Sequence, residues 1–171
     1  YNSYIINEDG LLFGLGNNSY NQISEEEIET YNQWKNIPLP KDCTKFVDCA
    51  VGENYIICLI EDINGNNKLY AQGKNDKNEC GIITEHEGDY IQFLTMCNCV
   101  NNLSFKKIYT RNSQSAAITV DGDLYIWGET GFNKNGEIYT GNFKKGKRDG
   151  KGVLQFANGD VYEGEFKDND G

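Results

Sequence analysis

Histidine, methionine and proline are scarce in this chain: one, one and two of them occur among its 171 residues. A Ser-His-Asp triad would have to use His86, but His86 lies in the polar stretch 85–89, where a solvated loop is the simpler expectation. The Gly-Xaa-Gly sequences at 14–16 and 150–152 are not followed by helical patterns, so neither is a nucleotide-binding fingerprint. We therefore expect no catalytic residues and a protein that is not an enzyme.

Long hydrophobic runs are also missing. No apolar stretch approaches the ~20 residues that cross a bilayer, and no signal-peptide pattern of charge, apolar stretch and small-residue cleavage site is present. We expect a cytoplasmic protein, with association to the cytoskeleton or to a membrane surface left open. Heavy use of Asn, Ile, Lys and Tyr is typical of an AT-rich genome, such as those of many protists.

Positive charge is in deficit, since 16 Lys and Arg face 26 Asp and Glu, for a net charge of −10. Residues 1–132 carry nine basic and nineteen acidic side chains, whereas residues 133–171 carry seven of each. An acidic surface repels phosphate backbones, so we expect no direct contact with nucleic acid.

Cysteines are scattered and no export signal accompanies them, so reduced thiols are expected. Cys97-Asn98-Cys99 has the spacing of a metal chelate, but no second pair matches it. We expect no metal and no cofactor. The six cysteines are Cys43, Cys49, Cys58, Cys80, Cys97 and Cys99.

A repeat dominates the first 132 residues. Residues 9–16 match residues 121–128 position by position, and residues 66–73 lie between them, with terminal glycines 57 and 55 residues apart. Upstream of each copy stands a β-rich run, at 4–6, 55–60 and 116–120. Asp-Gly or Asn-Asn between two such runs predicts a hairpin with a tight turn, slightly longer in the middle copy.

Further strands precede the second and third hairpins, at 46–52 and 105–109, and Asn-rich loops follow the first two, at 17–22 and 75–81. With Trp127-Gly128, this pattern resembles the RCC1 repeat of the regulator of chromosome condensation family. Leu15 and Gln72 replace the usual tryptophan, and Thr110-Arg111-Asn112 replaces the glycine turn. The resemblance implies an all-β fold over residues 1–132, a partial β-propeller with about three blades visible and others expected before Tyr1.

A second repeat fills residues 133–171. The segment 139–143 recurs as 162–166, and Asn135-Gly136 recurs as Asn158-Gly159, both at an offset of 23. This closely resembles the MORN (membrane occupation and recognition nexus) repeat, a β-hairpin array in which about one and a half copies are visible and more are expected after Gly171. Strand alternation puts the aromatic residues on one face, where Gly141 leaves room for a neighbouring ring.

Two candidate binding sites lie in this second part. The aromatic row is interpreted either as internal stacking or as a groove for a partner; it consists of Tyr139, Phe143, Tyr162 and Phe166. The basic cluster is interpreted either as a solvated turn or as a contact for anionic phospholipid; it consists of Lys144, Lys145, Lys147, Arg148 and Lys151. In the first part, Ser24-Glu25-Glu26-Glu27 resembles a capping box that opens a short helix, with an acidic docking surface as its functional interpretation.

These features favour a non-catalytic scaffold that binds protein partners through propeller loops and the MORN groove. Family resemblance implies cytoskeletal or ciliary partners. The alternative is a regulator or guanine-nucleotide exchange factor of a small GTPase, and a third alternative is the targeting region of a larger enzyme. Fold-level analogy alone does not separate the three.

Overall fold

The computed structural model describes residues 1–82, 84, 90–97, 103–129, 138–144, 147–155 and 160–167, with the backbone alone given for 138–144, 147–149 and 151. All regular structure in these ranges is β, which confirms the expected fold class. No helix among these residues is long and apolar enough to cross a membrane.

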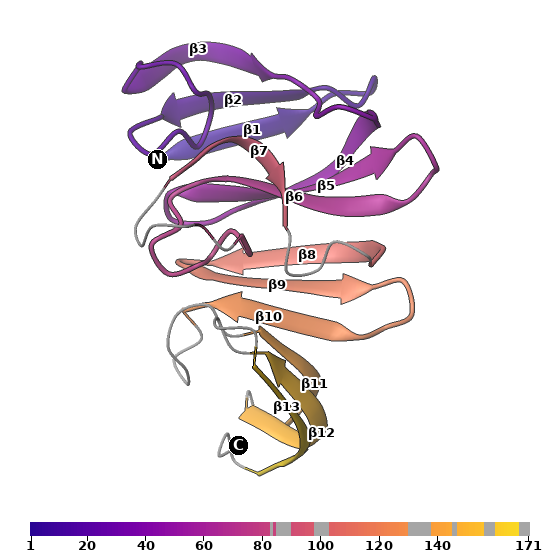
Figure 1. Cartoon of the computed structure of the whole chain (residues 1–171). Coiled ribbons are helices and arrows are strands. Elements are labelled where there is room, and N and C mark those ends of the chain that lie inside the picture. Colours follow the sequence, from indigo (N-terminus) through magenta and orange to yellow (C-terminus); the bar gives the residue numbers. More distant parts are fainter. Residues whose placement is uncertain are drawn as a thin grey trace.

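Within the described ranges, the strands form three antiparallel sheets that follow one another down the molecule in chain order (Figure 1). The first sheet holds β1 (Asn2–Ile6), β2 (Leu12–Asn17) and β3 (Thr30–Ile37). The second holds β4 (Cys43–Val51), β5 (Tyr55–Asp62), β6 (Asn67–Gly73) and β7 (Ile91–Met96). The third begins with β8 (Phe105–Arg111), β9 (Gln114–Thr119) and β10 (Leu124–Gly128). We call these sheets blades 1, 2 and 3, and the packed interfaces between them junctions 1/2 and 2/3.

The core lies between the blades, and β5 shows why. Its residues from Tyr55 to Ile60 are all buried, because blade 2 is covered on both faces. Alternate side chains enter different clusters: Ile56, Cys58 and Ile60 pack toward blade 1, whereas Tyr55, Ile57 and Leu59 pack toward blade 3. The continuous apolar run 55–60 is therefore the signature of the central blade.

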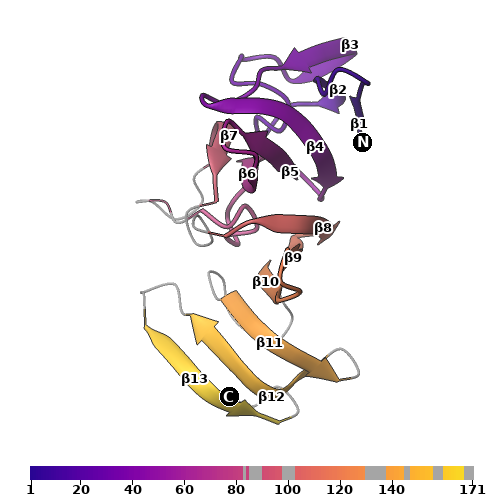
Figure 2. The same cartoon turned by 90° about the vertical axis from the view of Figure 1, so that its right-hand side faces the viewer.

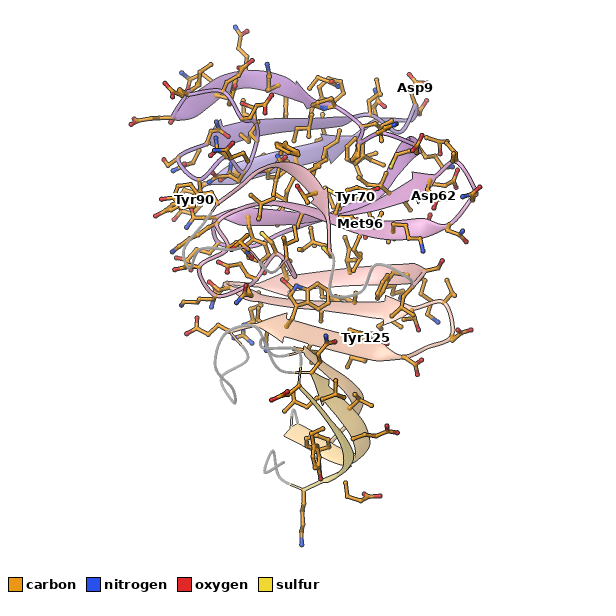
Figure 3. All side chains as sticks on the ribbon, viewed as in Figure 1. Asp9, Asp62, Tyr70, Tyr90, Met96 and Tyr125 are labelled. Atoms are coloured by element: carbon orange, nitrogen blue, oxygen red, sulfur yellow. The ribbon has the colours of Figure 1, made fainter. Side chains whose placement is uncertain are left out.

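The three hairpin turns share one hydrogen-bond pattern. A polar side chain at the first turn position, Asn7, Asp62 or Thr119, accepts a bond from the backbone nitrogen four residues later, and a glycine with positive φ follows at the fourth position. The turns of blades 1 and 2 lie on the same side of the molecule, where Asp9 and Asp62 are labelled in Figure 3.

The expectation of a longer middle turn at Asn66-Asn67 was wrong. The turn runs from Asp62 to Asn66 with Gly65 at its fourth position, as in the other copies. Each arm of the middle hairpin is instead two residues longer than in the third copy. Tyr55 pairs with Gly73 across the turn 62–66, whereas Gln114 pairs with Gly128 across the turn 119–123. The hydrogen bond to the Asp62 side chain fixes the length of the turn, so the additional residues extend the two strands.

The MORN segment follows blade 3 (Figure 2) and belongs to the same sheet, joined to it by the short pairing of Tyr125 and Ile126 with Thr140 and Tyr139. Strand β11 pairs with β10 on one side and with β12 on the other, and β13 completes a six-stranded sheet. The boundary expected at residue 132 therefore falls between two paired strands. The three added strands are β11 (Ile138–Lys144), β12 (Lys147–Gln155) and β13 (Val161–Phe166).

The short helix expected at Ser24–Glu29 is absent, which corrects the capping-box interpretation. The side-chain oxygen of Asn18 accepts bonds from the nitrogens of Ile23 and Ser24, while its amide donates to the carbonyls of Glu26 and Ile28. Those four backbone groups are committed to one asparagine, so the segment forms an ordered loop.

Candidate protein-interaction site

Two long loops connect the hairpins of blades 1 and 2 to their outer strands, and the first parts of these loops, residues 18–23 and 75–80, share one pattern. Asn18 and Asn75 are both buried, and each accepts a bond from the nitrogen five residues later, in Ile23 and Cys80. Asn21 and Asn78 both have positive φ, 59° and 55°. Asparagine tolerates this left-handed conformation better than other residues with a Cβ. These bonds were not foreseen, although the Asn-rich loops were recognised.

The residue that follows the left-handed asparagine in each loop supports the junction to the next blade. Gln22 and Glu79 are buried, and their side chains accept bonds from the nitrogens of Tyr20 and Lys77. Their carbonyl oxygens point to the neighbouring hairpin and act as acceptors across each junction. The loop of one blade is therefore a docking platform for the next.

Glu79 is the one carboxylate of this pair, and its pKa is raised from 4.5 to about 7 because burial disfavours the charged form. Bonds from backbone nitrogens at 77 and 79 oppose the shift, and nearby Asp76 adds to it. Gln22 makes the same contact with a neutral amide in blade 1. The two loops thus differ in charge at one buried position.

The hairpin side chain that donates to the loop carbonyl differs more between the two junctions than the loop residue does. At junction 2/3, Trp127 donates its indole N–H to the Glu79 carbonyl at 2.9 Å. At junction 1/2, Gln72 occupies the same position before the terminal glycine and donates its amide to the Gln22 carbonyl at 3.0 Å. The hydrogen bond is preserved, while the bulk of the indole is not.

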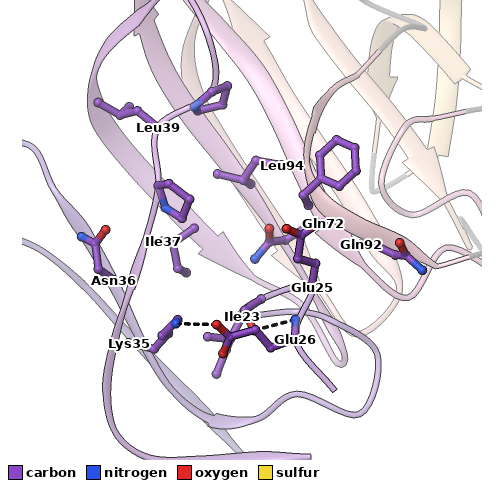
Figure 4. Close-up of a pocket in the computed structure, with 14 residues that line it drawn as sticks. Ile23, Glu25, Glu26, Lys35, Asn36, Ile37, Leu39, Gln72, Gln92 and Leu94 are labelled. Carbon is purple, nitrogen blue, oxygen red and sulfur yellow. Dashed lines mark hydrogen bonds and ion pairs between the residues drawn. The ribbon is translucent and has the colours of Figure 1, made fainter. Parts of the chain in front are cut away.

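A pocket of about 510 Å³ opens beside Gln72 at junction 1/2 (Figure 4). Its apolar lining comes from the loop of blade 1, the outer strands of both blades and the connection between β3 and β4, chiefly Ile23, Ile37, Leu94 and Leu39. This volume is in the range of ligand pockets, roughly 300–1,000 Å³. The lining residues are Ile23, Ser24, Glu25, Glu26, Lys35, Asn36, Ile37, Pro38, Leu39, Pro40, Gln72, Gln92, Phe93 and Leu94.

The mouth of the pocket is acidic. Glu26 accepts a bond from the Tyr31 hydroxyl and pairs with Lys35 at 3.1 Å, and these contacts lower its pKa. Glu25 lines the pocket, is exposed and forms no ion pair among the described residues. Phe93 stands on the outer strand β7 with 60% of its surface exposed. The arrangement joins an apolar floor to a free carboxylate and an exposed ring.

The expected aromatic row is described only in part. The Tyr162 and Phe166 rings meet edge to face at 5.2 Å; Phe166 is buried and Tyr162 is partly exposed. A Cβ on Gly164 would lie 2.8 Å from the Tyr162 hydroxyl, so the glycine leaves space for that ring. The side chains of Tyr139 and Phe143 lie outside the described residues, and partner binding by the row stays a prediction.

The basic cluster surrounds the end of the β11–β12 hairpin. The backbone register pairs Lys144 with Lys147 and Phe143 with Arg148, which places three of the five cations at that end. Their side chains, that of Lys151 and the whole of Lys145 lie outside the described residues. Lipid contact therefore stays a prediction, as does the solvated loop expected at His86, which also lies outside them.

Five of the six cysteines lie among the described residues. The described cysteines, all except Cys99, are free thiols. Cys49 and Cys58 face each other across β4 and β5 with sulfurs 3.8 Å apart. No group of three or more potential metal ligands occurs among the described residues.

Comparison with known proteins agrees with both halves of the architecture. Residues 139–161 match the MORN repeat family model. In solved structures, yeast RCC1 (Prp20) bound to Kap60 superposes with a TM-score of 0.64 at 23% identity, over 74% of this chain and 30% of that one. Prp20p from Saccharomyces cerevisiae, studied for its binding to Gsp1p and histones, gives 0.63 at 25% identity, over 74% and 31%. This chain joins RCC1-like propeller blades to a MORN repeat.

Two curated relatives match this chain by sequence. The guanine nucleotide exchange factor SRM1 of Saccharomyces cerevisiae is 27% identical over 124 residues, 72% of this chain and 25% of the relative. The X-linked retinitis pigmentosa GTPase regulator of Canis lupus familiaris is 24% identical over 135 residues, 78% of this chain and 12% of the relative. The chain thus spans a quarter or less of the length of these relatives.

Proposed function

We propose that this chain is part of the protein-binding surface of a small-GTPase regulator. The observation that carries the proposal is that two relatives, matched over 72% and 78% of the chain, are named as an exchange factor and as a GTPase regulator. A nucleotide exchange factor works by binding and needs no covalent chemistry of its own. This agrees with a surface built from blade loops and an interblade pocket.

The test uses the full-length protein and a panel of purified small GTPases. Each GTPase is presented nucleotide-free, GDP-bound and GTP-bound to the immobilised protein, and bound partners are then assayed for release of fluorescent GDP. An exchange factor prefers the nucleotide-free form and accelerates release by at least about tenfold. Binding to the GTP form without release indicates a regulator of another kind, and failure to bind any GTPase contradicts the proposal.

A scaffold is the second candidate, favoured by the single sheet that runs from β8 to β13. Because β10 pairs with β11, a partner on the blades and a partner on the MORN hairpins would be carried by one sheet. Cytoskeletal or ciliary partners, an anionic lipid surface and a cytoplasmic location belong to this proposal. Proximity labelling from the full-length protein tests it, since structural proteins enriched without a GTPase would favour the scaffold.

A further inference from the structure

The pocket at junction 1/2 is lined by Gln72, which is buried and is the counterpart of the buried Trp127 at junction 2/3. Counting from the equivalent asparagines Asn18 and Asn75, residues 23, 24 and 25 of the first loop correspond to residues 80, 81 and 82 of the second. The first three line the pocket. In the second loop, Cys80 and Ile82 pack in the same core cluster as Trp127, and a Cβ on Gly81 would lie 3.0 Å from the indole nitrogen.

Two substitutions therefore open and polarise the same space. Gln72 stands where Trp127 fills the junction, and Glu25 stands where Ile82 is buried against it. The bond to the loop carbonyl is kept at both junctions, at 3.0 Å and 2.9 Å, so the change removes bulk without removing the docking contact. A planar side chain supplied from outside would restore the apolar contacts that junction 2/3 makes internally.

The charge around the pocket selects the kind of chain that supplies this ring. Glu25 is exposed at the mouth, Glu27 and Glu29 are exposed on the same loop, and Lys35, the only cation in the lining, is paired with Glu26. Arg and Lys flanking an aromatic anchor would meet free carboxylates at the rim. An acidic ligand would be repelled by these carboxylates, and a neutral ligand would gain no attraction from them.

The strands that line the pocket favour a peptide over a small molecule. Among the described strands, β3 and β7 are the outermost of their sheets, and the pocket takes residues 35–37 from β3 and 92–94 from β7. The outer edge of a sheet offers backbone donors and acceptors to an extended chain. Phe93 adds an exposed ring at the mouth.

We propose that this pocket captures an aromatic side chain from a basic peptide segment of a partner protein. The anchor fills the space that Trp127 occupies at the next junction, and its basic neighbours pair with Glu25 and the loop carboxylates. This proposal is independent of the proposed GTPase regulation, because neither its evidence nor its test involves a GTPase.

The test begins with selection of a random twelve-residue phage-displayed peptide library on the full-length protein. Enriched sequences should hold Trp, Phe or Tyr with Arg or Lys within three positions. One is synthesised with a fluorescent label and titrated by anisotropy. Replacing its aromatic residue by Ala should abolish binding, and replacing its basic residues by Glu should weaken binding at least about tenfold.

The decisive variant is Gln72→Trp, which refills the pocket from inside and should abolish binding. Its matched control is Leu15→Trp, the equivalent position of the first hairpin, which does not line the pocket and should leave binding unchanged. Ser24 has a Cβ where Gly81 meets the indole, so a thermal melt must first show that Gln72→Trp folds. Phe93→Ser and Glu25→Lys, both exposed, provide an independent route and should each weaken binding about tenfold.

Several outcomes would overturn the proposal: no enriched peptide, enriched peptides that lack aromatic or basic residues, or equal binding to the wild type and to folded Gln72→Trp. Binding of free indole at an affinity equal to that of the peptide would also overturn it, because the flanking charges would then contribute nothing. Loss of peptide binding in Gln72→Trp and weaker binding in Phe93→Ser and Glu25→Lys, with binding retained in Leu15→Trp, supports the proposal.

Discussion

Junctions 1/2 and 2/3 are built on the same plan and differ in how they are filled. Both use a buried asparagine to order a loop and a loop carbonyl to receive a donor from the next hairpin. Junction 2/3 is closed by a buried indole, whereas junction 1/2 has a glutamine and an open pocket. The hydrogen bond sets the register of adjacent blades, and the side chain that makes it sets whether the junction is packed or open to a ligand.

The largest expected effect comes from making junction 2/3 resemble junction 1/2. Trp127→Gln keeps a donor for the Glu79 carbonyl but removes a fully buried indole, which should lower the free energy of unfolding by about 3 to 4 kcal/mol. Chemical denaturation followed by circular dichroism measures the loss, and hydrogen exchange should localise it to β8–β10. A loss below about 1 kcal/mol would mean that the hydrogen bond, not packing, holds the junction.

The two loop asparagines should differ in importance. Among the residues that the structure describes, Asn18 makes four hydrogen bonds to backbone groups of its loop, whereas Asn75 makes two, to Cys80 and Ile82. We expect Asn18→Ala to cost about 3 kcal/mol and Asn75→Ala about 2 kcal/mol, because the first leaves one buried and three partly buried backbone groups without this partner and the second leaves two buried ones. Hydrogen exchange should rise within the altered loop in each case. Equal costs would contradict this ordering.

Glu79→Gln sharpens the comparison, because it gives the loop of blade 2 the residue that stands at position 22 in the loop of blade 1. The folded pKa of about 7 lies above the ordinary value of 4.5, so the folded state holds the proton more tightly. The contribution of Glu79 to stability should therefore be most favourable below about pH 4.5, fall as the pH rises toward 7 and level off above it. The variant should remove this dependence and gain about 1 to 2 kcal/mol at pH 8, where the buried carboxylate is charged.

Thermal unfolding between pH 4 and pH 8 checks this prediction, with Gln22→Glu as the matched control. That reverse change gives the loop of blade 1 a buried carboxylate and should introduce a new dependence of stability on pH with the same sign. A Glu79→Gln profile that stays parallel to the wild type would show that other groups carry the pH dependence.

Sequence alone predicts the hairpins, because β-branched runs around Asx-Gly turns are local signals. Residues 55–60 are predicted as a strand on the same grounds, but burial on both faces follows only from the placement of three blades. The capping-box interpretation of Ser24–Glu29 failed because Asn18, outside the motif, commits its backbone groups. Local motifs do not reveal competition from a residue six positions away.

Only part of the candidate site could be predicted from the sequence. Gln72 is recognisable as a departure from tryptophan, yet its consequence depends on which loop packs against which hairpin, and that is a tertiary relation. The aromatic row follows directly from strand alternation, and the pair Tyr162 and Phe166 does meet. Whether the row receives a partner depends on neighbouring repeats, so Tyr139 and Phe143 keep their predicted role.

The smallest expected effect concerns a hydroxyl that only junction 2/3 uses between blades. Tyr55 Oη lies 2.7 Å from Ser115 Oγ and donates to the Gln114 carbonyl, whereas Tyr4 Oη donates to the Gln22 carbonyl within blade 1. Tyr55→Phe should cost about 1 kcal/mol, the usual net value of one buried hydrogen bond. Tyr4→Phe should cost less, because the Gln22 carbonyl keeps its bond from Gln72. Urea denaturation of both variants distinguishes the two, and a larger loss for Tyr4→Phe would contradict this ordering.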